Sequence, residues 1–323
     1  MLGIFKTTPQ GLMEVGSDAI NDNGNWINLA APSSEELHAV AGGTGIDFDF
    51  LRYPLDNEER PRIECDNGQV LVIIHVPVEE QWTKISAYNT IPLGIILTDS
   101  VVTTVSLEEN QVITPFLQNR VKGFSTFKKN RFLLQILFKT AVLYLHFLRQ
   151  IDKKSRDVEI ALQQSTENTE VMKLLELGKS LVHFTTSLKS NDLVMEKLLR
   201  TWNSTSTSEL KKAIQFYPED EELLEDVLVE NKQAIQMAEI NSSILNSMMD
   251  AFASIISNNL NKVMQFLTVV TIVLALPTMV ASFYGMNVAL PFQHRPTAFW
   301  GTLGLSLALS VGAIHLFKRK RMF

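Results

Sequence analysis

Two apolar runs near the C-terminal end constrain the fold of this chain more than any other feature. Residues 263–283 and 298–317 contain no Asp, Glu, Lys or Arg. Each run is about 20 residues long, the length that a helix needs to cross a hydrocarbon core of roughly 30 Å. A basic tail follows, made of Lys318, Arg319, Lys320 and Arg321. Because basic segments stay preferentially in the cytoplasm, we expect two transmembrane helices in the cell membrane, with both termini cytoplasmic.

The charge of the chain is divided in the same way. The whole sequence has a net charge of −6, and residues 263–323 contain five basic residues and no acidic one, so residues 1–262 carry −11. An acidic body concentrates cations and disfavours nucleic acid as a partner, although acidic cytosolic domains are also common. Cys65 is the only cysteine, which excludes a disulfide framework and a thiolate metal site. The first residues show no basic segment followed by an apolar core, so we expect no cleavable signal peptide.

The N-terminal part is typical of an α+β domain. Residues 70–76 form a continuous run rich in β-branched side chains, which predicts a buried strand. Residues 91–97 and 101–105 predict two more strands on either side of a turn.

One short helix is predicted between the early strands. Ser33 is followed three residues later by Glu36, which is the spacing of a capping box. We expect this helix to end at Gly42-Gly43.

The next part of the chain is helical. Residues 132–148 are apolar enough to suggest a third membrane span, but Gln135, Lys139 and His146 interrupt the run. A lysine at the centre of a membrane costs roughly 2.5–3.5 kcal/mol to insert, so a buried helix of the soluble body is the better interpretation. A helix over 151–163, a turn over 165–169 and a return helix then predict a long antiparallel hairpin.

A long stalk helix is expected to begin at Pro218. Acidic side chains fill its first turn, where they stabilise the positive end of a helix. No helix stop occurs before the membrane, so the helix would extend to Asn287 over roughly 100 Å at 1.5 Å per residue. A coiled-coil-like seam runs along its first part and includes polar members. The seam consists of Leu224, Leu228, Asn231, Ile235, Ala238, Ser242, Leu245, Met249, Phe252 and Ile256.

The first apolar run carries a polar and small-residue stripe on one helical face, because its members recur every three or four residues. The stripe consists of Asn261, Met264, Thr268, Thr271, Ala275, Thr278, Ser282 and Gly285. Polar groups against hydrocarbon each cost several kcal/mol, so this face meets something other than lipid. Two interpretations remain open: the hydroxyls bond to their own helix and the stripe is a packing seam, or several copies place it around water.

The stripe has no formal charge, which constrains the ion that it could conduct. Mg²⁺ dehydrates reluctantly and is often held with its waters in place. Neutral oxygens could bind such an ion through its water shell. Met264 and Leu267 could form a narrow section that closes by dewetting, or could serve only in helix packing.

These residues resemble the CorA family of magnesium and divalent-cation transporters. The resemblance is strongest in Tyr284-Gly285-Met286-Asn287, followed by a short loop, a final span and a basic tail. Residues 258–268 and Pro277-Thr278 also match the family pattern. In the N-terminal part, residues 26–29 and 59–64 look like its N-terminal domain.

The resemblance implies a funnel-shaped homopentamer whose central pore is made by the first span. Gly285, Met286 and Asn287 would form the selectivity filter, with Asn261 and Thr278 as polar rings and Met264 and Leu267 as a constriction. The basic tail would form a collar. Such transporters are typically gated by the ion itself, held between cytoplasmic domains of neighbouring subunits.

This sequence departs from the family pattern in two places. Asp226 matches one regulatory ligand, but the expected acidic partner falls at Tyr53, so Asp56 and Glu58 become the candidates. The outer loop contains no acid and has His294 and Arg295 instead, which would weaken capture of cations at the mouth.

We therefore expect a passive transporter of hydrated Mg²⁺, with Co²⁺ and Ni²⁺ as further candidate ions, and no enzyme or organic cofactor. No Gly-rich phosphate loop ending in Lys-Ser/Thr is found. The alternatives are a zinc transporter of the same architecture and a non-transporting membrane-anchored coiled-coil scaffold. The expected parts are an α/β domain (1–118), a helical hairpin (119–217), a stalk helix (218–262), a pore-lining helix with the filter (263–287), an outer loop (288–297), a second transmembrane helix (298–317) and a basic tail (318–323).

Overall fold

The computed structural model describes residues 1–80, 87–164, 168–204, 209–214, 217–287 and 297–319. The chain separates into two compact units, Met1–Met248 and Met249–Phe323, and each is described here by itself. The boundary falls inside one long helix, so that helix contributes residues to both units.

The first unit is built on a seven-stranded sheet with the order β2-β1-β3-β7-β6-β5-β4. Only β3 and β7 pair in parallel, while all other neighbours are antiparallel. The strands are β1 (Leu2–Thr8), β2 (Gly11–Glu14), β3 (Asn25–Ala30), β4 (Arg62–Asp66), β5 (Gln69–Glu80), β6 (Ala87–Leu97) and β7 (Val102–Ser106).

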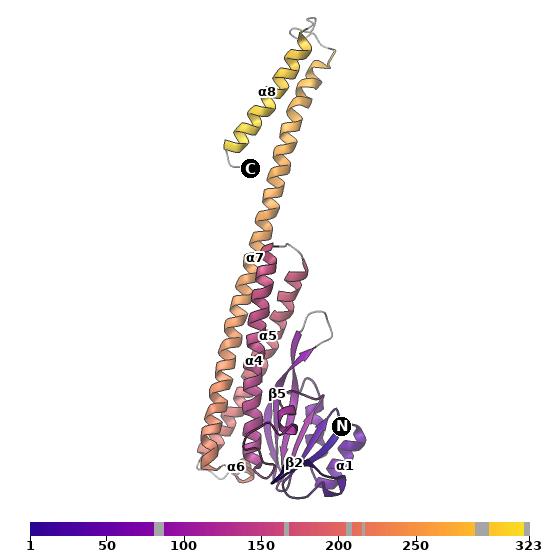
Figure 1. The fold of residues 1–323 in the computed structure, drawn as a ribbon, viewed down its shortest axis with the longest axis vertical. Helices are drawn as coiled ribbons and strands as arrows, with labels where there is room; N and C mark the ends of the chain where they lie inside the picture. The colour runs from indigo at the N-terminus through magenta and orange to yellow at the C-terminus, as the bar shows by residue number, and fades with distance from the viewer. Residues whose placement is uncertain (81–86, 165–167, 205–208, 215–216, 288–296, 320–323) are drawn as a thin grey trace. The chain divides into compact units, whose positions relative to one another are not determined.

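Strand β5 shows why the predicted run at 70–76 is apolar without alternation. Side chains of a strand point to opposite faces in turn, and both faces of this sheet are covered. Val72 and Ile74 belong to a core shared with the long helices α4 and α5, whereas Leu71 and Ile73 belong to a second core shared with α1 and α2. Figure 1 shows the sheet with α1 on one side and α4 and α5 on the other. The buried strand predicted from the sequence is confirmed.

The predicted capping box is also confirmed, in front of α1 (Ser34–Thr44). The Ser33 hydroxyl accepts from the Glu36 backbone N–H at 3.2 Å, and the Glu36 carboxylate accepts from the Ser33 N–H at 2.9 Å. This bond lowers the pKa of Glu36. The predicted end was wrong, because Gly42-Gly43 lie inside the helix. Gly45 ends it in the left-handed conformation at φ 71°.

Strands β1, β2, β3 and β4 were not predicted. Strand β4 pairs with β5 through the tight turn Asn67-Gly68, where both residues have positive φ, 49° and 78°. Asn-Gly between apolar runs is the strongest short-range signal for a hairpin, so this strand could have been found from the sequence.

The helical hairpin consists of α4 (Lys129–Gln164) and α5 (Asn168–Asn203). The two helices predicted at 132–148 and 151–163 are one continuous helix. This helix is long and apolar enough to cross a membrane, but its apolar window is 67% buried inside the protein, which agrees with the predicted buried helix. The predicted turn at 165–169 falls largely outside the described residues.

Short elements connect these helices to the sheet and to the long helix that follows. They are η1 (Ser17–Ala19), α2 (Phe48–Arg52), η2 (Tyr53–Leu55), α3 (Thr114–Leu117), α6 (Glu209–Ala213) and η3 (Pro218–Asp220). The long helix α7 (Glu221–Tyr284) then starts where Pro218 and its acidic neighbours predicted a helix.

Within the first unit, α7 packs on the hairpin by the predicted seam. Leu224, Leu228, Ala238 and Leu245 are buried. Two amides are buried as well: Asn231 of the seam and Asn241, which was not a predicted member. Asn231 donates to the Leu188 carbonyl and to the Asp192 carboxylate at 3.4 and 3.1 Å, and Asn241 donates to the Leu148 carbonyl at 3.1 Å. Ile256, the last predicted member, is exposed.

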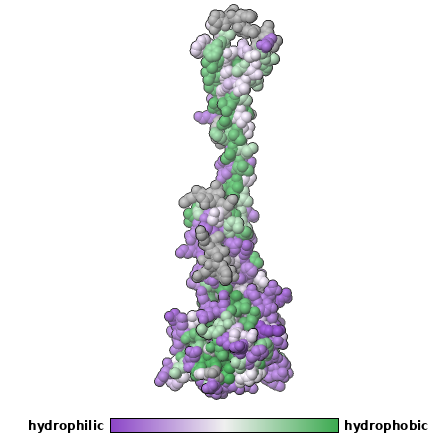
Figure 2. Space-filling model, turned by 90° about the vertical axis from the view of Figure 1, so that its right-hand side faces the viewer, coloured by the Kyte–Doolittle hydropathy of each residue, from purple (hydrophilic) through white to green (hydrophobic). Residues whose placement is uncertain are grey.

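The second unit contains the end of α7 and α8 (Ala298–Arg319). Both helices are long and apolar enough to cross a membrane, and the apolar windows are 11% and 0% buried. Figure 2 shows apolar side chains along this unit and many polar side chains over the first. These surfaces agree with the two predicted transmembrane helices.

We predict that Gly94→Val lowers the free energy of unfolding by about 1–3 kcal/mol, because overpacking a closed site forces its neighbours apart. Gly94 pairs with Ile73 and Val105 in the middle of the sheet, and a Cβ there would overlap the ring of Pro54. Thermal unfolding of the full chain in detergent, followed by tryptophan fluorescence, measures the change. Gly42→Ala is the control, because a Cβ at this exposed position in α1 meets nothing within 4 Å. This control should unfold at the same temperature as the wild type or higher, and an equal loss in both variants would contradict the prediction.

Candidate ion pathway and metal-sensing residues

The predicted stripe lies along one face of α7, and all of its members are exposed in a single chain. They are Asn261, Met264, Thr268, Thr271, Ala275, Thr278, Ser282 and Gly285. The buried positions in this part of α7 are Val269 and Val280, and the half-buried positions include Val273 and Leu276. At about 100° per residue, these four side chains lie on the side of the helix opposite to the stripe. The stripe is therefore not covered by the chain's own second span.

Helix α8 contacts α7 through small residues. The half-buried positions of this otherwise exposed helix recur at steps of three or four: Ala298, Thr302, Ser306, Ser310, Ala313 and Phe317. Small side chains let two helices in a membrane approach closely. The Ser310 hydroxyl donates to the Val273 carbonyl at 3.4 Å. That carbonyl has no donor four residues later in its own helix, because residue 277 is proline.

The threonines of the stripe bond back to their own helix. Thr268, Thr271 and Thr278 donate to the carbonyls of the residues four positions earlier at 2.8, 2.8 and 3.0 Å. Each hydroxyl proton is thereby turned toward the backbone, and the oxygen keeps lone pairs to accept hydrogen bonds from the side. The bonds expected for a packing seam are thus present, and they leave a face of acceptors.

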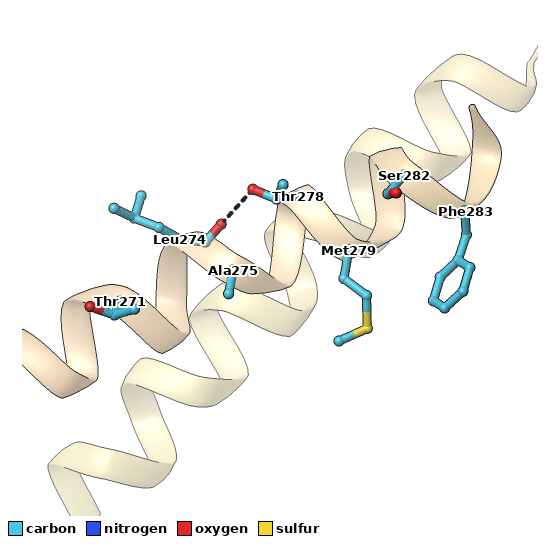
Figure 3. A pocket seen from close by; sticks show the side chains of 7 residues that line it. All are labelled: Thr271, Leu274, Ala275, Thr278, Met279, Ser282 and Phe283. Carbon is cyan, nitrogen blue, oxygen red and sulfur yellow. Dashed lines mark hydrogen bonds between the residues drawn. The ribbon is translucent and has the colours of Figure 1, made fainter. Parts of the chain in front are cut away.

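An open hollow follows this face. It is lined by Thr271, Leu274, Ala275, Thr278, Met279, Ser282 and Phe283. All seven belong to α7, so the hollow is a trough along one helix and not an enclosed cavity. Figure 3 shows the Thr278 hydroxyl directed at the Leu274 carbonyl, with α8 behind the helix.

The three predicted filter residues come directly after α7. The Gly285 N–H donates to the Ala281 carbonyl at 2.9 Å and the Met286 N–H donates to the Phe283 carbonyl at 3.3 Å, which closes the last turn. Gly285, Met286 and Asn287 are all exposed. The outer loop from residue 288 to 296, with His294 and Arg295, lies outside the described residues.

At the other end of the stripe lie the residues predicted to form the constriction. Met264 and Leu267 are 55% and 56% exposed, so neither is packed within one chain. Of the predicted basic collar, Lys318 and Arg319 form the last turn of α8. Lys320 and Arg321 lie outside the described residues.

The predicted metal-sensing residues do not meet within one chain. Asp226 is exposed on α7, and Asp56 and Glu58 are exposed in the segment after η2. The described residues contain no group of three or more His, Cys, Asp or Glu side chains that could hold a metal ion. A site made of these three carboxylates would therefore have to form between copies of the chain.

Tyr53, where an acid was expected, has a packing role. The Arg62 guanidinium lies 4.9 Å from the centre of its ring, and Arg62 also pairs with Glu59 and Glu64. These hydrogen bonds and ion pairs raise the pKa of Arg62 against the opposing effect of burial. The ring and the ion pairs hold both ends of the segment that carries Asp56 and Glu58.

A half-buried histidine ties this segment to the hairpin, and nothing in the sequence pointed to it. His75 Nε2 lies 2.8 Å from the Glu59 carbonyl, which can only accept, so this nitrogen carries the proton. Nδ1 then accepts from the Ser187 hydroxyl on α5 at 3.0 Å. The backbone of His75 exchanges hydrogen bonds of 2.9 and 2.8 Å with the buried amide of Asn191.

Comparison with known proteins decides the family. The sequence model of the family described as CorA-like Mg²⁺ transporter protein matches residues 21–319. The chain belongs to the CorA family. Membership makes it a divalent-cation transporter and not an enzyme, which confirms the resemblance and disfavours the scaffold alternative.

Relatives of this CorA protein match over most of their length. The cobalt/magnesium transport protein CorA of Methanocaldococcus jannaschii is 29% identical over 308 residues, which cover 91% of this chain and 90% of that protein. The cobalt/magnesium transport protein CorA of Thermotoga maritima is 22% identical over 306 residues, which cover 92% of this chain and 82% of that protein.

Solved structures agree. The complete structure of the CorA magnesium transporter from Methanocaldococcus jannaschii has a TM-score of 0.82 at 25% identity, covering 99% of this chain and 98% of that one. The full-length CmaX protein shares the fold, with a TM-score of 0.72 at 16% identity over 99% of this chain and 97% of that one. The predicted fold class is confirmed.

We predict that the stability of the first unit falls as the pH drops below about 6.5, the ordinary pKa of histidine. Burial disfavours the imidazolium and lowers the pKa of His75 below 6.5. Between the folded and unfolded pKa values the unfolded chain binds a proton that the folded chain does not, so stability is complete above this window and is lost as pH falls through it.

Unfolding midpoints at pH 7.5 and 5.5 test this prediction in the full chain. His75→Gln should show a smaller decrease than the wild type, whereas His183→Gln, at an exposed position of α5, should show the same decrease. Equal pH dependence in all three proteins would remove His75 as the cause.

Proposed function

We propose that this CorA protein is a passive channel for hydrated Mg²⁺ in the cell membrane, with Co²⁺ and Ni²⁺ as further candidate ions. The observation that carries the proposal is the exposed face of acceptors on α7, which α8 leaves uncovered and which leads to Gly285-Met286-Asn287. Relatives named as cobalt/magnesium transport proteins support these ions.

The chemistry of the face suits an ion that keeps its waters. Water bound to a cation points its hydrogens outward, so it needs acceptors around it. The threonine oxygens of α7 are such acceptors, because their protons are held by the helix. Water-mediated contacts of this kind are nearly as favourable as direct hydrogen bonds and spare Mg²⁺ the cost of dehydration.

Passive uptake needs only the membrane potential. Moving one charge is worth about 2.3 kcal/mol per 100 mV, so a divalent ion gains roughly 4.6 kcal/mol per 100 mV of inward-negative potential. Among the described residues the face carries no group of His, Cys, Asp or Glu that would favour Zn²⁺, so zinc transport is the weaker alternative.

A central pore requires several copies of the chain, and we propose the homopentamer that the family resemblance implies. Exposed apolar side chains on α7 of the first unit support self-association. Val229, Ile240 and Ile244 are 63%, 59% and 47% exposed. In this assembly Met264 and Leu267 would form the constriction and Lys318 to Arg321 the collar. We keep the seven-part division made from the sequence and the cytoplasmic position of both termini as part of this proposal.

We predict that Asn287→Ala abolishes Mg²⁺ flux into proteoliposomes while the protein still assembles. The amide oxygen would accept from the ion's waters at the outer ring, and alanine offers no acceptor. Asn23→Ala makes the same change at an exposed turn of the first unit and should leave flux intact. Normal flux through the Asn287 variant would remove the filter from the proposal.

Gating is proposed to use Asp226 on α7 together with Asp56 or Glu58 of a neighbouring copy. Their exposure in one chain leaves these carboxylates available for a shared ion. Bound Mg²⁺ would hold the copies in a closed arrangement when the cytoplasmic concentration is high. Coupling to the pore would pass along α7, which contains both Asp226 and the stripe.

We predict that Asp226→Lys raises flux at high internal Mg²⁺, because an ammonium group repels the regulating ion. Glu225→Lys is the matched control, since it makes the same charge change at the adjacent exposed position, about 100° around the helix. Proteoliposomes loaded with increasing Mg²⁺ give the inhibition curve. An unchanged curve for Asp226→Lys, or the same relief in both variants, would exclude Asp226 from the sensor.

A further inference from the structure

A second hollow lies in the first unit, away from the proposed ion pathway. It has a volume of about 420 Å³, within the range of pockets that bind small molecules. Four segments form it: the turn between β6 and β7, the start of α4, α6, and the residues just before α7. The lining residues are Leu97, Thr98, Asp99, Phe127, Lys128, Lys129, Asn130, Arg131, Lys212, Ala213, Tyr217, Glu219 and Asp220.

The lining is positively charged within an acidic body. It contains four basic and three acidic side chains, a net charge of +1, whereas residues 1–262 carry −11. We call it the basic hollow. Its basic members are Lys128, Lys129, Arg131 and Lys212.

Two of these basic side chains form ion pairs, one of them with a buried carboxylate and one exposed. Arg131 bonds to Asp220 at 2.9 Å, and that carboxylate is only 1% exposed, so this pair is part of the folded structure. Lys128 pairs with Glu219 at 3.2 Å, and both side chains are more than half exposed. Exposed pairs of this kind contribute little to stability, so another anion can replace Glu219 at little cost.

The other two charges form no ion pair within the part of the chain that the structure describes, although the Asp99 carboxylate acts on Lys129 from a distance. Lys129 Nζ donates to the Thr98 and Asp99 carbonyls, both at 2.6 Å. An ammonium has three protons, so one remains for a ligand. Among the described residues neither Lys129 nor Lys212 forms an ion pair. Burial lowers the pKa of Lys129, the Asp99 carboxylate offsets part of that effect, and a bound anion would offset more of it.

Two aromatic rings complete the lining. Phe127 and Tyr217 are 52% and 53% exposed. Exposed rings offer stacking surfaces for a flat heterocycle.

From these observations we propose that the basic hollow binds a phosphate-bearing anion. Lys128, Lys129 and Lys212 contact its phosphate oxygens, because charge-assisted hydrogen bonds to phosphate are among the strong ones. The chemistry is shared by a nucleoside triphosphate, whose base would stack on Tyr217, and by inorganic polyphosphate. Bound phosphate would replace Glu219 as the partner of Lys128. Glu219 lies two residues before Glu221, where α7 begins.

Equilibrium dialysis of the full-length protein in detergent, in Mg²⁺-free buffer, tests the proposal with ATP and with inorganic tripolyphosphate as probes. The variants are Lys212→Gln, Lys129→Gln and Tyr217→Ala. Lys179→Gln is the control, because this exposed lysine of α5 lies outside the hollow. Lys212 is exposed on the short helix α6, so its replacement tests the site even if Lys129→Gln disturbs folding.

We expect saturable binding of at least one probe by the wild type and by Lys179→Gln, weakened about tenfold in Lys212→Gln by loss of one charged contact. ATP bound more tightly than tripolyphosphate, with that preference lost in Tyr217→Ala, supports a nucleotide. Equal binding of both probes, unaffected by Tyr217→Ala, supports polyphosphate. No saturable binding, or binding that is equal in Lys212→Gln and Lys179→Gln, overturns the proposal. Because no ion flux is measured, this result is independent of the transport proposal.

Discussion

Polar atoms cannot be left against hydrocarbon, and the second unit depends on this constraint more than on any other. Helix α7 places its hydroxyl and amide side chains on one face and its branched apolar side chains on the other. Helix α8 covers only the apolar side, at Val269, Val273 and Val280. The polar face therefore remains for water or for other copies of the chain, and a single copy of the membrane part is chemically incomplete.

In the first unit, specific hydrogen bonds fix how the long helices pack against each other and against the sheet. The sheet is covered by apolar cores on both faces, and apolar contacts alone have little direction. Buried amides supply it: Asn191 holds the strand at His75, while Asn231 and Asn241 hold α7 on the hairpin. A buried polar group has few positions in which its hydrogen bonds are met, so such groups select one arrangement. His75 in turn holds the segment that carries Asp56 and Glu58, through its contact with the Glu59 carbonyl.

Much of this structure could be predicted from the sequence, because periodicity and local signals indicate where its helices and strands lie. The run at 70–76, the capping box at Ser33 and the stripe of the first span all depend on spacing along the chain. The strand after Pro61 was missed although Asn67-Gly68 marked its turn. His75 and the basic hollow could not have been foreseen, since each joins segments far apart in the sequence. Assembly and ion binding also lie beyond one chain, because the polar face and Asp226 are exposed within it.

The hydrogen bond between Ser310 and the Val273 carbonyl has a mechanical consequence. Proline leaves a helix short of one backbone bond and makes that turn the easiest place for it to bend. In this protein the carbonyl without a donor is that of Val273 in the first span, and the Ser310 hydroxyl of the second span donates to it. The two spans are thus latched together at the weakest turn of α7. A change of curvature at Pro277 would have to carry α8 along or release the latch, so the outer helix can act as a brace on the shape of the inner one.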